Sequence, residues 1–222
     1  MKEVVLAVAF QADRLKEAAS HIEEHYGVKI IISEEKIPLG TAGPLALARE
    51  ILQESEEFIM LNADVMCEFP LKKMLEFHRS HGCEGTIAVT KVLDPSKYGV
   101  IVFEESGKVA SFVEKPPTFV GDRINAGIYI FNKTVLDRVE AKPMSIERIV
   151  FPRMASDEQL YAFDMKGFWM DVGQPMDFLS GINLFLKAMQ QRSVSPIFPS
   201  SHLPISYFGF HSCANLSCWY FK

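Results

Sequence analysis

Two aspartates in this sequence each follow a short apolar run and precede a turn. Asp64 ends the stretch Phe58–Asp64 (FIMLNAD), and Asp171 lies within Gly167–Pro175 (GFWMDVGQP). At separate strand ends, the two carboxylates could converge on a hard cation such as Mg²⁺, which binds one or two carboxylates together with phosphate oxygens. The other interpretation is structural, because aspartates often stabilise turns. Spacing alone favours the turn, since a sequence cannot show convergence.

A lysine and a glutamate stand side by side where a third strand stops. Phe112–Pro117 (FVEKPP) ends in two prolines, which hold Glu114 and Lys115 near the strand terminus. A lysine there can neutralise a phosphate, and a glutamate can accept hydrogen bonds from sugar hydroxyls. The alternative is an exposed charge pair, and these residues alone favour it.

Small residues mark three further places where a ligand could approach the backbone. Asn125-Ala-Gly127 precedes the apolar run IYIF, and Tyr98-Gly99 opens another strand. The stretch Ile37–Ala48 (IPLGTAGPLALA) is a glycine turn with Pro44 suited to the first helical position. Ser145-Ile-Glu147 reads as a helix start with a capping serine.

The elements that must position these residues alternate between strands and helices, which predicts an α/β fold with a largely parallel sheet. From Ser193 onward, proline, serine and scattered aromatics show no periodicity, so we expect an irregular or disordered tail. The predicted strands are 4–10, 28–32, 58–61, 85–92, 98–103, 109–113, 128–131, 160–164 and 168–170, and the predicted helices are 11–25, 44–53, 71–81 and 176–191.

Composition narrows the possible partners and the compartment. The formal net charge is −5, so no overall basic field favours nucleic acid or an anionic membrane. No apolar run approaches the length that spans a bilayer, and the N-terminal MKEVVLAVAF reads as a strand rather than a signal peptide. The four cysteines form no C-x-x-C pair, which fits a reducing, cytoplasmic setting.

Seven motifs, in this order, resemble one family: PLGTAGP, LNADV, KYGVI, FVEKP, INAGIYIF, SIE and GFWMDVGQP. They are similar to those of the sugar-1-phosphate nucleotidyltransferases, and most of all to the mannose-1-phosphate guanylyltransferases (GDP-mannose pyrophosphorylases) of the catalytic beta type. The resemblance covers residues 1–191 and implies a Rossmann-like nucleotidyltransferase domain with a mostly parallel mixed sheet. Residues 192–222 are unlike the family.

The resemblance also implies an activity, in which a phosphate oxygen of mannose 1-phosphate attacks the α-phosphorus of GTP to give GDP-mannose and pyrophosphate. It implies Mg²⁺ as the cofactor, bound by Asp64 and Asp171, and Lys115 as the partner of the sugar phosphate. It also implies assembly with like chains or with a related regulatory subunit. The residues implied for the nucleotide are Leu39, Gly40, Thr41, Gly43, Asn62 and Asp64, and those for the sugar are Gly99, Glu114, Lys115, Asn125 and Gly127.

The sequence departs from the family pattern in two places. The glycine-rich loop G-G-x-G-T-R-L and the P-K-P segment, which serve the triphosphate, are not found in it, nor are the hexapeptide repeats of a C-terminal β-helix. We therefore expect an N-terminally truncated domain with little or no guanylyltransferase activity by itself. The alternatives are a non-catalytic subunit that binds sugar nucleotide, and a glucose-1-phosphate nucleotidyltransferase.

Overall fold

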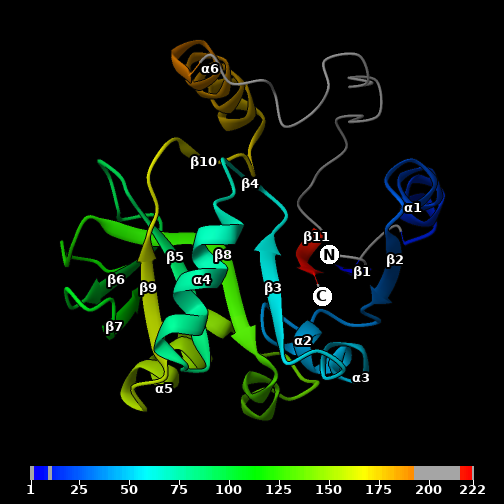
Figure 1. The fold of residues 1–222 in the computed structure, drawn as a ribbon, viewed down its shortest axis with the longest axis horizontal. Coiled ribbons are helices and arrows are strands. Elements are labelled where there is room, and N and C mark those ends of the chain that lie inside the picture. The colour runs from blue at the N-terminus through cyan, green and yellow to red at the C-terminus, as the bar shows by residue number, and fades with distance from the viewer. Residues whose placement is uncertain (1–2, 10–11, 193–215, 222) are drawn as a thin grey trace.

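The protein, seen in a computed structural model that describes residues 3–9, 12–192 and 216–221, is built around a nine-stranded mixed sheet (Figure 1). The strand order is β2-β1-β11-β3-β8-β5-β9, and β6 pairs with both β8 and β7. The strands of this sheet are β1 (Glu3–Val8), β2 (Lys29–Glu34), β3 (Glu57–Asn62), β5 (Gly85–Lys91), β6 (Gly99–Phe103), β7 (Val109–Glu114), β8 (Arg123–Asn132), β9 (Leu160–Asp164) and β11 (Leu216–Phe221).

The α/β prediction is confirmed, whereas the expected predominance of parallel pairing is wrong. The strands β2, β1, β3, β5 and β9 do point the same way, as follows from their pairings. However, β11 and β8 run antiparallel between them, so that β1–β2 and β5–β9 are the parallel pairs among the described strands. A direction shared by several strands does not reveal which strands are neighbours.

Helices cover the sheet, and most lie where the sequence predicts them. The helix 71–81 has the expected ends, while the predicted helix 44–53 is divided at Ala48 into two short helices. Ser145 caps a helical turn as expected, since its Oγ accepts a hydrogen bond from Arg148 N–H (3.1 Å). The helices are α1 (Ala12–Tyr26), α2 (Gly43–Leu47), α3 (Arg49–Leu52), α4 (Leu71–His81), the 3₁₀ helix η1 (Lys133–Arg138), the π-helical turn η2 (Ile146–Val150), α5 (Phe151–Ser156) and α6 (Pro175–Arg192).

Two features of the fold are absent from the sequence-based prediction. The short strands β4 (Val65–Cys67) and β10 (Trp169–Asp171) form a separate two-stranded sheet, of which only β10 overlaps a predicted strand, the one at 168–170. The predicted irregular tail contains strand β11, which is part of the main sheet, so that prediction is wrong for Leu216–Phe221. The rest of the tail beyond α6, residues 193–215 and 222, lies outside the described residues.

Apolar residues are buried on both faces of the sheet because side chains alternate along each strand. Phe58 and Met60 of β3 contribute to the larger cluster, beneath α2, α3 and α5, whereas Ile59 belongs to a second cluster beneath α4.

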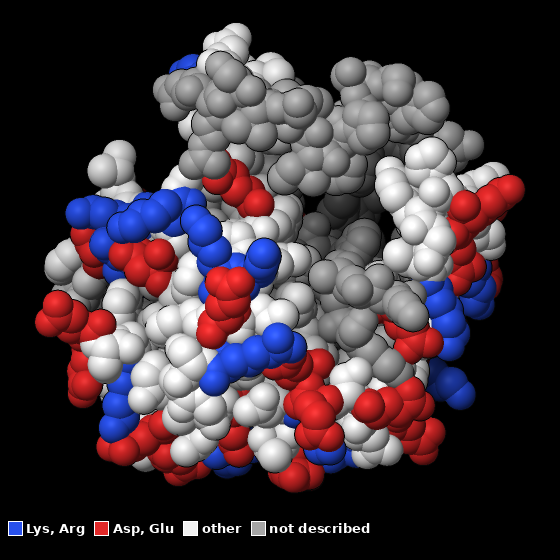
Figure 2. All heavy atoms as spheres, in the orientation of Figure 1, with Lys and Arg blue, Asp and Glu red and all other residues white. Residues whose placement is uncertain are grey.

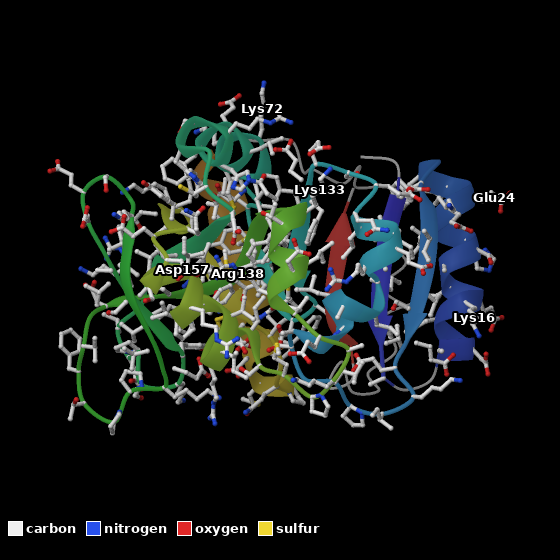
Figure 3. The ribbon with its side chains drawn as sticks, turned by 90° about the horizontal axis from the view of Figure 1, so that it is seen from below. Lys16, Glu24, Lys72, Lys133, Arg138 and Asp157 are labelled. Carbon is white, nitrogen blue, oxygen red and sulfur yellow. The ribbon has the colours of Figure 1, made fainter. Side chains whose placement is uncertain are left out.

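At the surface, acidic and basic side chains are interspersed, as Figure 2 shows for one face. Arg138 of η1 illustrates how they connect elements, because it pairs with Glu84 (2.5 Å) and with Asp157 (2.6 Å) after α5 (Figure 3).

A closed ring of hydrogen bonds attaches α4 to β5 and β8. Cys83 N–H donates to Nδ1 of His81 (3.0 Å), so that neutral His81 carries its proton on Nε2 and donates to Thr86 Oγ1 (2.8 Å). The Thr86 hydroxyl then donates to Nδ1 of His78 (2.8 Å), whose Nε2 donates to Asn132 Oδ1 (3.0 Å). Asn132 Nδ2 returns the ring to the Cys83 carbonyl (3.0 Å). Each imidazole donates a hydrogen bond from one ring nitrogen and accepts one at the other. An additional proton on either imidazole would remove its acceptor and break the ring.

We expect acid to destabilise the protein through these two imidazoles. Burial lowers the pKa of His81 to about 4, with a further contribution from His78, and burial also lowers the pKa of His78. The unfolded chain therefore binds more protons than the folded chain as the pH falls from about 6.5 towards 4, and stability falls with it. Allowing for the solvent that screens half-exposed His81, we expect its loss at pH 5 to be about 1 kcal/mol.

Urea unfolding at pH 7 and pH 5 measures this loss. His81→Asn should reduce the pH dependence of the urea midpoint. A midpoint of the native chain that does not move between the two pH values would contradict the prediction.

Candidate functional site

A cleft of about 160 Å³ opens where β3 and β7 end and where the small β4–β10 sheet meets β8. It gathers all but four of the predicted site residues. Its lining consists of Asn62, Asp64, Val65, Lys97, Tyr98, Gly99, Glu114, Lys115, Asn125, Gly127, Glu147, Trp169 and Asp171.

The β4–β10 sheet brings the two aspartates together. Asp171 is paired in register with Val65, and Val172 N–H donates to the Asp64 carbonyl (2.7 Å). A Cβ added at Gly173 would lie 3.1 Å from Asp171 Oδ1 and 3.2 Å from Asp64 Oδ2, so both carboxylates border the same small space. The convergence that the spacing left undecided is therefore present.

The carboxylate pair has the electrostatics of a cation site. Burial raises the pKa of Asp64, and the nearby charge of Asp171 raises it further. A divalent cation would remove this repulsion, and two carboxylates leave the remaining positions to water and phosphate oxygens, as Mg²⁺ prefers. Within the described residues, no group of three or more histidine, cysteine, aspartate or glutamate side chains is arranged to hold a metal. The two carboxylates are therefore the candidate cation ligands of the cleft.

Glu114 is the last residue of β7 and Lys115 follows it, and both residues line the cleft. Lys115 has a φ of +45°, a conformation that costs a non-glycine residue about 1 kcal/mol or more, and its N–H donates to the Tyr98 carbonyl (3.1 Å). Burial raises the pKa of Glu114, as does the charge of Glu147, while Lys115 opposes the shift. Strain of this kind is common at functional sites.

Asn125 and Gly127 form a tight corner of β8. Asn125 Oδ1 accepts from Gly127 N–H (3.0 Å), and its Nδ2 donates to the Tyr129 hydroxyl (2.8 Å). Gly127 has a φ of +73°, and a Cβ there would lie 2.8 Å from Val65 and 3.0 Å from Asn62 Nδ2. Glycine is therefore required by the backbone and by the packing, whether or not a sugar binds.

The remaining predicted residues, Leu39, Gly40, Thr41 and Gly43, do not line the cleft. The two glycines allow close packing on the segment 142–144. A Cβ on Gly40 would lie 2.6 Å from the Met144 carbonyl oxygen, and one on Gly43 would lie 2.6 Å from that of Lys142. Backbone bonds join the same segments, from Ala42 N–H to Met144 (2.9 Å) and from Met144 N–H to Leu39 (3.0 Å). Packing within the chain accounts for both glycines.

Thr41 connects this loop to the cleft through Glu147. Its hydroxyl donates to Glu147 Oε2 (2.6 Å) and accepts from Ile146 N–H (2.9 Å), and the Ser145 hydroxyl also donates to Oε2 (2.7 Å). Glu147 lines the cleft, so the loop and the cleft share one carboxylate.

We expect Thr41→Val to destabilise the protein by about 1–3 kcal/mol, because the Ile146 N–H and the Glu147 carboxylate each lose a partner. Thr41→Ser keeps the hydroxyl and serves as the matched control. Thermal unfolding of both variants tests the prediction, and a valine variant as stable as the serine variant would refute it.

Sequence reasoning gave no ligand role to Lys97, Glu147 and Trp169, all of which line the cleft. Trp169 Nε1–H donates to the Ala126 carbonyl (2.8 Å), and its ring makes an edge contact with Tyr98 at 5.5 Å between centroids. Lys97 and Trp169 do lie within the motifs KYGVI and GFWMDVGQP, near the predicted site residues Gly99 and Asp171. Glu147 was interpreted only as an acidic residue in the first turn of a helix.

The fold is that of a nucleotidyltransferase. The model of the nucleotidyl transferase family matches residues 1–188, and the chain belongs to that family. Among named relatives, it is 54% identical over 193 residues to the mannose-1-phosphate guanylyltransferase catalytic subunit beta of Dictyostelium discoideum, a match that covers 86% of this chain and 54% of the relative. It is 52% identical over 198 residues to the Drosophila melanogaster protein of the same name, covering 89% and 54%. The chain thus spans about half the length of these curated relatives.

Solved structures agree on the fold. HddC from Yersinia pseudotuberculosis is 28% identical, with a TM-score of 0.69 over 83% of this chain and 79% of that one. The same protein complexed with GMP-PN aligns with a TM-score of 0.65 over 82% of this chain and 77% of that one. No described helix of the present chain is long and apolar enough to cross a membrane.

Proposed function

We propose that this chain is the nucleotidyltransferase part of an enzyme that makes GDP-mannose and pyrophosphate from mannose 1-phosphate and GTP. The observation that carries the proposal is the cleft, which combines a carboxylate pair, Lys115 and the polar groups of Glu114 and Asn125. The names of the relatives supply the substrates. Those relatives are named as catalytic subunits, which does not favour a purely regulatory role.

In the proposed reaction, a phosphate oxygen of mannose 1-phosphate attacks the α-phosphorus of GTP and pyrophosphate leaves. We propose that Lys115 pairs with the sugar phosphate, holding it for attack and neutralising part of its charge. Glu114, Asn125 and the backbone at Gly99 and Gly127 bind the sugar hydroxyls. Positioning and charge neutralisation are the principal means of catalysis in phosphoryl and nucleotidyl transfer.

We propose Mg²⁺ as the cofactor, held by Asp64 and Asp171. When bound, it would neutralise charge on the phosphate oxygens. The proposal is supported by the shared space between the two carboxylates and by the repulsion that raises the pKa of Asp64.

For the nucleotide we propose Asn62 and the loop Leu39, Gly40, Thr41 and Gly43. A structural relative was solved with a ligand named as a GMP derivative, and Thr41 is joined to the cleft through Glu147. The packing of Gly40 and Gly43 argues for contact through the outer side of the loop only.

Assembly with like chains or with a related regulatory subunit belongs to the same proposal. So does a cytoplasmic setting, which the free thiols of Cys67 and Cys83 suit.

Calorimetric titrations with and without Mg²⁺ test the proposal. We expect GDP-mannose to bind saturably and more tightly with Mg²⁺, and mannose 1-phosphate to bind in preference to glucose 1-phosphate. Nucleotide selectivity is tested in parallel with GTP and a thymidine nucleotide. Equal binding of both sugar phosphates would reject mannose as the substrate. No binding of any of these ligands would reject the function.

A further inference from the structure

Strand β11 lies between β1 and β3 and pairs with both, as the red strand in Figure 1 shows. Both pairings are antiparallel. Trp219, for example, is opposite Leu6 on one side and Leu61 on the other. The ladder with β1 runs from Val4–Phe221 to Val8–Leu216 and contains one irregularity between Ala7 and Val8.

This strand is the hydrogen-bonded bridge between two parts of the sheet. Among the described strands, β1 pairs with β2 and β11, and β3 pairs with β11 and β8, so the β1–β2 pair reaches the rest of the sheet through β11. An empty gap would leave two facing rows of backbone N–H and C=O groups without partners.

The residues that border the gap are those of a sheet interior. Val5 and Ala7 of β1 and Met60 of β3 are fully buried and belong to one cluster, with Leu45 and Leu52 of the helices that cover this face. Val4 and Leu6 are buried on the opposite face. With β11 in place, helices on one face therefore pack against β1 and β3 on either side of it.

We propose that the space between β1 and β3 is a strand-binding slot, whose ligand is an extended six-residue peptide segment supplied by the chain's own residues Leu216–Phe221. The ligand must run antiparallel to both neighbours and present an N–H at each paired position. The sequence LSCWYF meets these needs, because it has no proline and no charge and is rich in residues that favour strands. Neither the family assignment nor the proposed activity requires this slot.

Amide hydrogen exchange on the full chain tests the assignment, together with two variants at one position. Tyr220→Pro removes an N–H from the ladder, whereas Tyr220→Phe retains the backbone and is the matched control. In the native chain and in the phenylalanine variant we expect amides of 216–221 to exchange at least ~100-fold more slowly than in a free peptide. In the proline variant we expect β1 and β3 to lose protection as well.

The proline variant also allows the slot to be filled from outside. A fluorescein-labelled peptide with the sequence of residues 215–222 should bind it saturably, and should bind the phenylalanine variant at least ~10-fold more weakly, because there the tethered strand competes. If the proline variant does not fold, amide hydrogen exchange of residues 216–221 in the native chain is the measurement that tests the proposal. Free-peptide exchange rates for 216–221 in the native chain would overturn the proposal. So would β1 and β3 protection that survives the proline, or a dimer, detected by sedimentation, in which copies exchange this strand.

Discussion

Replacing Lys115 by methionine is expected to weaken the binding of mannose 1-phosphate about a thousandfold. A lysine–phosphate pair about 4 Å apart is worth roughly 4 kcal/mol at an intermediate effective dielectric, and each factor of ten corresponds to about 1.4 kcal/mol. Lys115 lies on the cleft beside Glu114, where the proposed sugar phosphate would need a positive partner. Calorimetry, supported by ligand-observed NMR for weak complexes, measures the loss.

The methionine variant isolates the charge because both side chains are unbranched and similar in length. The backbone of residue 115 has a φ of +45°, and methionine bears the same strain there as lysine, so thermal stability should be unchanged. Lys91→Met serves as the matched control, since Lys91 is exposed and pairs with Asp122 (2.8 Å) outside the cleft. Unchanged affinity in Lys115→Met, or equal losses in both variants, would remove Lys115 from the proposed site.

Replacing Asp171 by asparagine is expected to have two opposite effects. The affinity for Mg²⁺ in the presence of GDP-mannose should fall at least ~100-fold, because a carboxylate ligand is lost. The metal-free chain should become more stable at neutral pH, because the negative charge near the half-buried Asp64 carboxylate is gone.

The raised pKa of Asp64 predicts how the stabilisation by Asp171→Asn changes with pH. The folded-state pKa of Asp64 is raised, so the folded chain retains a proton at pH values where the unfolded chain has lost it. Asp64 therefore opposes folding once the pH rises through its folded pKa, and this penalty disappears in acid. The stabilisation by Asp171→Asn should be visible at pH 7 and should shrink towards pH 4.

Thermal unfolding with and without Mg²⁺ and GDP-mannose measures both effects. Asp13→Asn on α1 removes an equal charge from an exposed site, where Asp13 pairs with Lys16 (2.9 Å), and should change neither quantity beyond the loss of a surface pair. Mg²⁺ binding that persists in the Asp171 variant would rule out this carboxylate as a ligand.

The parts of the fold that the sequence predicts well are those whose signals are local. Helix α4 ends where an amphipathic pattern meets Gly82, which takes a φ of +66° at its C-cap, and η2 begins at the capping Ser145. Strand β11 is the opposite case. Its residues favour strands, but its partners are at the other end of the chain, and the proline- and serine-rich stretch before it obscured the pattern.

The candidate site, too, can be predicted from the sequence only where its signals are local. Asp64, Lys115 and Asn125 were singled out because each stands at the end or the corner of a recognisable strand. That Asp64 and Asp171 share one small space depends on the pairing of β4 with β10, and although the sequence predicts a strand at 168–170, the three residues of β4 are too few to show a periodicity. For Gly40 and Gly43 the sequence cannot separate two causes, because a glycine needed for close packing on a neighbouring carbonyl has the same letter as a glycine needed for a ligand.

The place of β11 in the sheet also bears on how this protein folds. Val4 is opposite Phe221, a separation of 221 − 4 = 217 residues, so β1 is synthesised long before the strand that pairs with it. Contacts between such distant residues form slowly, because a very large loop must close before they contribute any stability. During synthesis, helices can pack on β1 and β3 before β11 is available to pair with them. Each of these two strands then has one apolar, unpaired edge exposed. We expect the nascent chain to depend on chaperones until β11 has left the ribosome.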